Sequence, residues 1–85
     1  MSRREELNKM LNELDACNEE VLACRKEFED IIDATLDGFN DKELSKDTMK
    51  RLIKVCQIQI NEADIEISET KSIREFIVKQ IEELE

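Results

Sequence analysis

The sequence predicts an all-α fold: an antiparallel two-helix coiled-coil hairpin that assembles into a four-helix bundle. Helix breakers are almost absent, since the 85 residues contain no proline and one glycine. Apolar residues recur at heptad spacing through both halves of the chain, as in a coiled coil. A polar stretch around the single glycine separates the halves. We therefore expect one helical-hairpin domain over 1–85, with helices at 3–37 and 48–84 and a hinge at 38–47.

The first helix is predicted from two apolar series, each with a seven-residue period. The first series is Leu7, Leu14, Val21 and Phe28, and the second series is Met10, Cys17, Cys24 and Ile31. Ser2 and Glu5 have the spacing of a capping box, which places the start of the helix at residue 3. Gly38 can adopt the left-handed conformation that ends a helix, with Phe39 making the closing apolar contact.

The second helix follows a seam of eleven positions, nine of them apolar. These are Met49, Ile53, Cys56, Ile60, Ala63, Ile67, Thr70, Arg74, Ile77, Ile81 and Leu84. Its start is open between a capping box formed by Asn40 and Glu43 and a later cap at Ser45 or Asp47. Isoleucines at 58/60 and 65/67 alternate with strand period, but the helical seam continues through residues 61–64 and favours a helix.

Charge favours an antiparallel arrangement. The first helix ends acidic and the second begins basic, and the arginines at 3 and 4 would meet the terminal glutamates at 82, 83 and 85. Each such surface pair contributes only a few tenths of a kcal/mol, about enough to select an orientation. Folding near residue 42 would place residue i opposite residue 85 − i, so that Cys24 lies near Ile60, Cys17 near Ile67 and Cys56 near Phe28.

The three cysteines are interpreted as buried thiols that serve as small apolar residues. Cys17 and Cys24 lie on one helix, separated by about 10.5 Å of axial rise. That separation exceeds the roughly 7 Å limit for a disulfide. An intermolecular disulfide or a redox switch is the alternative.

The second helix carries more apolar residues than one seam requires. This outer stripe consists of Leu52, Val55, Ile58, Ile65, Ile73 and Phe76. A two-helix hairpin would leave these side chains in water, and large exposed apolar patches mark interfaces. We therefore expect the outer stripe to bind a protein partner. A second copy of the chain, giving a dimeric four-helix bundle, is favoured over a different protein.

Composition argues against several functions. A net charge of −9 disfavours binding to nucleic acid and to anionic membranes. No apolar run approaches the roughly 20 residues of a membrane span, and the N-terminus lacks the pattern of a signal peptide, so a cytoplasmic protein is expected. Histidine is absent, and no phosphate loop or Cys-x-x-Cys pair is present. We expect neither an enzyme nor a metal or cofactor site.

One segment is similar to an EF-hand calcium loop. Over residues 33–44, acids or a hydroxyl occupy loop positions 1, 3, 5 and 9, and Gly38 occupies position 6. Position 12 is Leu44 instead of glutamate, and position 8 is Asn40 instead of an apolar residue. Hinges between helices also collect Asp, Asn and Gly as cap and turn residues. A degenerate calcium binder is therefore the most distant functional alternative.

Two functional hypotheses remain ahead of it. The first is a non-catalytic α-helical interaction module, either a self-associating hairpin or a small subunit or adaptor of a larger assembly. The second is a small acidic chaperone that shields a helical client. In size and helix pattern, although in no motif, the chain resembles the co-chaperones of type III secretion, and that resemblance implies a 1:1 complex with a client.

Overall fold

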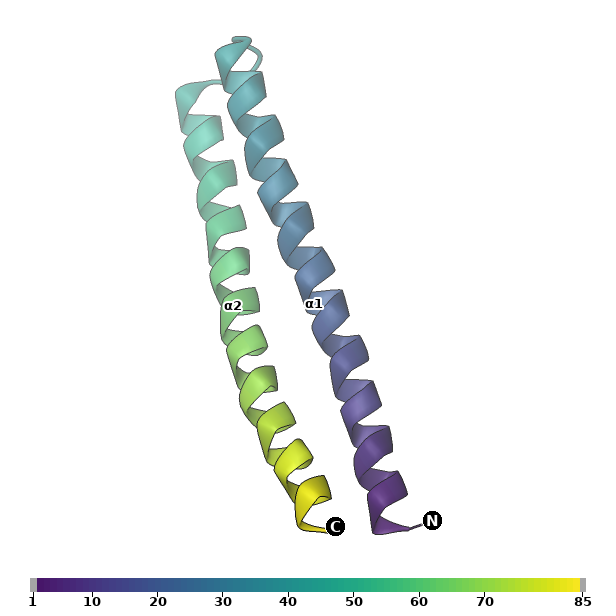
Figure 1. Cartoon of the computed structure of the whole chain (residues 1–85). Coiled ribbons are helices and arrows are strands. Elements are labelled where there is room, and N and C mark those ends of the chain that lie inside the picture. Colours follow the sequence, from purple (N-terminus) through teal and green to yellow (C-terminus); the bar gives the residue numbers. More distant parts are fainter. Residues whose placement is uncertain (1, 85) are drawn as a thin grey trace.

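The computed structural model describes residues 2–84 and consists of two long helices. Helix α1 spans Arg3–Asn40 and helix α2 spans Lys46–Glu83, with a short loop at 41–45. The helices run antiparallel side by side along a rod 61 Å long, so that both ends of the chain lie at one end of the rod (Figure 1). Residues 2–84 contain no strand. The all-α hairpin is confirmed.

Both helices begin at a serine cap. The Ser2 hydroxyl accepts a hydrogen bond from the Glu5 backbone N–H at 3.1 Å, as the capping box predicts. The Ser45 hydroxyl accepts one from the Thr48 N–H at 3.2 Å, so Ser45 is the cap of α2 among the candidates. Helix α2 therefore begins at residue 46, two residues earlier than predicted.

The end of α1 lies beyond the predicted one. Gly38 is helical, and the left-handed residue is Lys42, with φ of 62°. The N–H of Glu43 donates to the Gly38 carbonyl at 2.9 Å and that of Lys42 to the Phe39 carbonyl at 3.0 Å, which is the bond pattern of a Schellman motif. The prediction that Gly38 ends the helix is therefore wrong.

Glycine is needed at position 38 because a side chain there would crowd Leu44, and not because of the backbone conformation. A Cβ at this position would lie 3.1 Å from Cδ1 of Leu44 and 3.3 Å from its Cγ. The loop returns over the bare Cα, and the Leu44 side chain lies where any larger residue at 38 would project. This close approach lets five loop residues join two adjacent antiparallel helices.

The interior of the hairpin is thin. Among the described residues, the buried apolar side chains are Leu7, Cys56, Ala63 and Ile77, and Thr35 is buried with its hydroxyl donating to the Ile31 carbonyl at 2.7 Å. Thr35 continues the first series by one heptad; Leu7 of that series is buried, and Leu14, Val21 and Phe28 are half-buried. The first series is therefore the face of α1 that packs on α2.

The second series is not part of this interface. Its four members, Met10, Cys17, Cys24 and Ile31, are all exposed. Their expected place is taken by a third series, four residues after each member of the first, whose members are half-buried: Leu11, Asn18, Arg25, Ile32 and Phe39. Helix α1 is thus rotated about its axis relative to the predicted seam, because Leu11 and Ile32 draw the packing face to their side.

This rotation changes the state of the thiols. Cys56 is buried, as predicted, but Cys17 and Cys24 are exposed free cysteines. The interpretation of three buried thiols is wrong for these two, which belong to the uncovered second series.

The helices are also offset from the predicted register. The Nε of Arg25 lies 2.7 Å from Oδ1 of Asp64, and the Nε of Arg74 lies 2.9 Å from Oδ1 of Asp15. Residue 25 was expected opposite residue 60, so the pairing lies about one turn further along α2. Part of the offset arises because the loop is centred beyond residue 42, and part because arginine reaches along the rod.

Candidate protein-binding surface

One side of the hairpin is an open groove between the helices. It is bordered by two rows of side chains, each with a seven-residue period. The row on α1 is Met10, Cys17, Cys24 and Ile31; the row on α2 is Leu52, Gln59, Glu66 and Ile73. Two shallow hollows lie between these rows, and the floor of the groove is formed by the packed face of both helices.

The hollow nearer the chain ends is apolar. It is lined by Met10, Glu13, Leu14, Cys17, Ile73 and Ile77. Met10 is 47% exposed and Ile73 is 49% exposed, whereas Ile77 beneath them is buried. The two border residues therefore project beyond the contact that the hairpin makes with itself, and their apolar surface remains available.

The hollow in the middle of the rod has an acidic rim. It is lined by Glu20, Val21, Cys24, Arg25, Phe28, Gln59, Glu62, Ala63 and Glu66. The guanidinium of Arg25 is engaged by Glu29 and Asp64, whereas within residues 2–84 the glutamates at 20, 62 and 66 take part in no ion pair. This section presents three unmatched negative charges around a small apolar floor.

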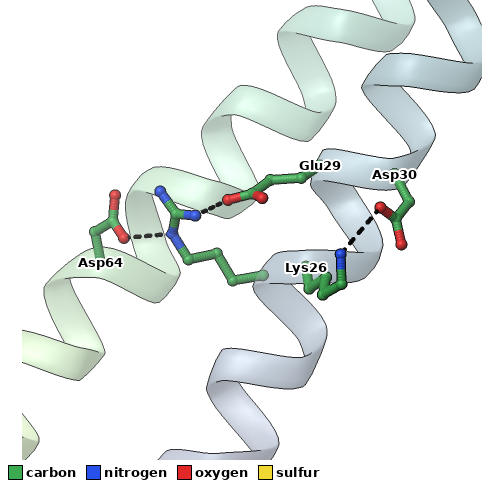
Figure 2. A network of polar contacts seen from close by, with 5 residues as sticks. Lys26, Glu29, Asp30 and Asp64 are labelled. Carbon is green, nitrogen blue, oxygen red and sulfur yellow. Dashed lines mark hydrogen bonds and ion pairs between the residues drawn. The ribbon is translucent and has the colours of Figure 1, made fainter.

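The opposite side of the hairpin carries two ion pairs that join the helices. Arg25 joins Glu29 of its own helix to Asp64 of α2, and Figure 2 shows the Glu29 and Asp64 carboxylates converging from the two helices. Lys26 pairs with Asp30 at 3.6 Å within α1. The second link across the helices is the Arg74–Asp15 pair. Both of these cross-helix pairs lie on the side away from the groove.

Charges at the loop end of the rod behave differently from the prediction. Within the described range 2–84, no ion pair joins the acidic end of α1 to the basic start of α2. Two ion pairs between the helices, Arg25–Asp64 and Arg74–Asp15, lie away from the loop end. Apolar periodicity assigns the positions of these two arginines to the packing face or its flank. Their partners, Asp64 and Asp15, could be identified only once the register of the two helices was known.

All six residues of the outer stripe are exposed, with fractions from 39% for Leu52 to 64% for Phe76. At the coiled-coil period of about 3.5 residues per turn, they spread over about 100° of the α2 surface. Leu52 and Ile73 border the groove, and Val55 and Phe76 follow them around α2. At 100° per residue, Ile58 and Ile65 lie about 200° from the buried Cys56 and Ala63 and form a ridge on the back of α2.

The calcium-like segment adopts a different conformation from a calcium loop. Asp33, Thr35 and Asp37 lie within about one turn of α1, and Thr35 is on the opposite side of the helix from the two aspartates. The Thr35 hydroxyl donates a hydrogen bond to the Ile31 carbonyl. Within the described part of the chain, no cluster of three His, Cys, Asp or Glu side chains is placed to hold a metal ion.

Sequence periodicity identified the apolar residues of this surface but not their grouping. The periodicity places the second series in the interior, whereas the structure leaves its four members exposed. The three exposed positions at 22, 36 and 84 add single apolar side chains elsewhere. The signal that could have revealed the groove is the width of the α1 stripe, since Leu11 and Ile32 make the third series an alternative packing face.

Comparison of the chain with models of protein families, with curated proteins and with solved structures yields no match. Neither described helix has a stretch of the length and hydropathy needed to cross a lipid bilayer.

Proposed function

We propose that this protein is a non-catalytic α-helical interaction module, a hairpin that self-associates or serves as a small subunit or adaptor of a larger assembly. The observation that carries the proposal is the imbalance between buried and exposed apolar surface. Four apolar residues are buried, whereas eleven large apolar residues are at least 39% exposed among residues 2–84. Soluble proteins rarely leave contiguous apolar surface of this kind uncovered unless another molecule binds it.

The size of the chain supports the same proposal. A domain of 85 residues buries a smaller fraction of its surface than larger domains, and domains of this size often gain stability by oligomerisation. Here the hairpin has one layer of contact between two helices. A further helix along the groove or the α2 ridge would bury side chains that are now half in water.

Pairing of two copies would give the dimeric four-helix bundle expected from the sequence. The ridge formed by Ile58 and Ile65 suits such pairing, because it faces away from α1 and leaves the hairpin intact. The second candidate function, a small acidic chaperone, is favoured by the acidic section of the groove. A client helix with basic residues would match it, and a second acidic chain would not.

The proposal is tested by changing Ile58 and Ile65 together to Asp. We expect assembly to be lost with helicity retained, because both side chains are exposed and make no part of the hairpin interior. Light scattering gives the mass and circular dichroism the helicity. The matched control changes Ala16 and Ala23 to Asp, which adds the same charge at the same seven-residue spacing on the outer face of α1.

Two outcomes separate the alternatives. A stable dimer that the ridge variant converts to monomers supports self-association. A chain that behaves poorly alone but forms a 1:1 complex when co-expressed with a client supports the chaperone. If the wild-type chain is a well-behaved monomer and the ridge variant changes neither mass nor partner binding, the proposed function is wrong.

A further inference from the structure

The two rows that border the open groove have the same layout. On α1, Met10 and Ile31 lie 21 residues apart with Cys17 and Cys24 between them. On α2, Leu52 and Ile73 lie 21 residues apart with Gln59 and Glu66 between them. Because the helices are antiparallel, Met10 and Ile73 meet in one hollow, and Ile31 and Leu52 lie one heptad beyond the middle hollow at the loop end.

The groove is therefore divided into three sections. Two apolar sections lie near its ends, separated by three heptads or about 32 Å of helix. The section between them is acidic, with Glu20 on one helix and Glu62 and Glu66 on the other. Neighbouring glutamates extend the acidic border along α1, since Glu6, Glu13, Glu20 and Glu27 recur once per heptad.

We propose that this groove binds one amphipathic helix of another protein, with apolar side chains three heptads apart and Lys or Arg side chains between them. This inference rests on the proposed function and names the chemistry of the partner. Apolar side chains in the end sections would cover Met10 and Ile73 at one end and Ile31 and Leu52 at the other. Basic side chains in the middle would meet Glu20, Glu62 and Glu66, which form no ion pair within residues 2–84.

Charge decides between this partner and a second copy in the same groove. Two copies related by a twofold axis would bring the acidic middle sections against each other, and like charges held together are destabilising. Arg25, the cation that lines this section, does not offset the repulsion, because its guanidinium is already held by Glu29 and Asp64. The groove thus favours a basic helix, while the ridge on the back of α2 stays available for pairing of copies.

The test uses the full-length chain and a designed helical peptide of about 30 residues, long enough to span both apolar sections. The peptide carries Leu at the seam positions of its first and last heptads and Lys beside the seam in between. A matched peptide carries Glu in place of each Lys. A fluorescent label on the peptide reports binding by anisotropy, which the chain does not obscure because it has no Trp or Tyr.

We expect the Lys peptide to bind at least tenfold more tightly than the Glu peptide and to weaken as salt is raised. Changing Glu20, Glu62 and Glu66 together to Gln should weaken it about tenfold, the combined effect of three modest surface pairs. The matched control changes Glu19, Asp33 and Glu75 to their amides, which removes the same charge outside both rows. This control should leave the affinity unchanged.

Thiol reactivity locates the bound peptide. Cys17 lines the hollow nearer the chain ends, and Cys24 lines the hollow in the middle of the rod. Both are exposed, whereas Cys56 is buried. The Lys peptide should slow the reaction of Cys17 and Cys24 with a thiol reagent in the folded protein. Binding that leaves both rates unchanged would place the peptide elsewhere and overturn the proposal.

Equal affinity for the two peptides, or binding of neither, would also overturn it. Self-association that is lost when Ile31 and Ile73 are changed to Asp would identify a second copy as the occupant and would have the same consequence. In each of these cases the proposed function stands if the Ile58 and Ile65 variant still alters mass or partner binding. It fails together with the groove only if that variant has no effect either.

Discussion

Two isoleucines one helical turn apart allow a comparison of how much a buried and an exposed apolar side chain each contribute to the free energy of unfolding. Ile77 is 4% exposed and Ile73 is 49% exposed, and both line the same hollow. Changing Ile to Ala removes three carbons, worth about 0.8 kcal/mol each when fully buried. For Ile77 the loss is about 2.3 kcal/mol, and incomplete collapse of the space left behind raises it toward 3 kcal/mol. For Ile73 the transfer loss is about half, near 1.2 kcal/mol.

Urea unfolding at low protein concentration, followed by the circular dichroism of the helices, measures the loss of unfolding free energy for each variant. Thermal unfolding under the same conditions gives the corresponding shift of the midpoint. We expect Ile77→Ala to lower the midpoint of thermal unfolding by about 10–20 °C, and Ile73→Ala by about half as much, since each kcal/mol shifts a domain of this size by roughly 4–8 °C. If Ile73→Ala costs as much as Ile77→Ala under these conditions, Ile73 is covered in the isolated protein. The distinction between a closed interior and an open groove would then be refuted.

Three further outcomes follow from single positions. Asn18 has a buried side-chain oxygen with no hydrogen-bond partner among the described residues, so Asn18→Leu should stabilise the hairpin by about 1 kcal/mol in urea unfolding. Lys42 is left-handed, so Lys42→Val should destabilise by about 1–2 kcal/mol, whereas Lys42→Gly should raise the free energy of unfolding by a few tenths. A double-mutant cycle with Arg25→Ala and Asp64→Ala should give a coupling below about 1 kcal/mol that falls further in high salt; a coupling that does not respond to salt would indicate a desolvated pair.

The helices and their direction were predictable because they depend on local signals. Two serine caps, the near absence of helix breakers and a continuous apolar period determine where helices form, and a short polar connection makes them antiparallel neighbours. The end of α1 was not predictable in the same way. Glycine is used there for the close approach of Leu44, a contact that exists only after the loop has folded back.

The face that α1 presents was harder to predict than its existence. Residues 10, 17, 24 and 31 and residues 11, 18, 25 and 32 flank the first series on either side, and either set completes a seven-residue repeat. The apolar composition of the former set favours it, yet the structure packs the latter, which contains Asn18 and Arg25. Arg25 can occupy this flank because Glu29 and Asp64 bind its guanidinium. This binding of the Arg25 guanidinium needs residues of both helices, and it produces no seven-residue pattern in the sequence that could have predicted it.

That choice of face links the stability of the hairpin to its proposed role. Packing the polar flank inward leaves Met10, Cys17, Cys24 and Ile31 outward, so apolar side chains that could have enlarged the interior instead border the groove. A ligand that binds only the folded hairpin stabilises it by mass action, by about 2.7 kcal/mol at a hundredfold excess over the dissociation constant. With so thin an interior, a gain of that size would be a large part of the total stability. The unfolding midpoint should therefore rise with the concentration of a groove-binding helix, and it should rise less when Ile73 is replaced by Asp.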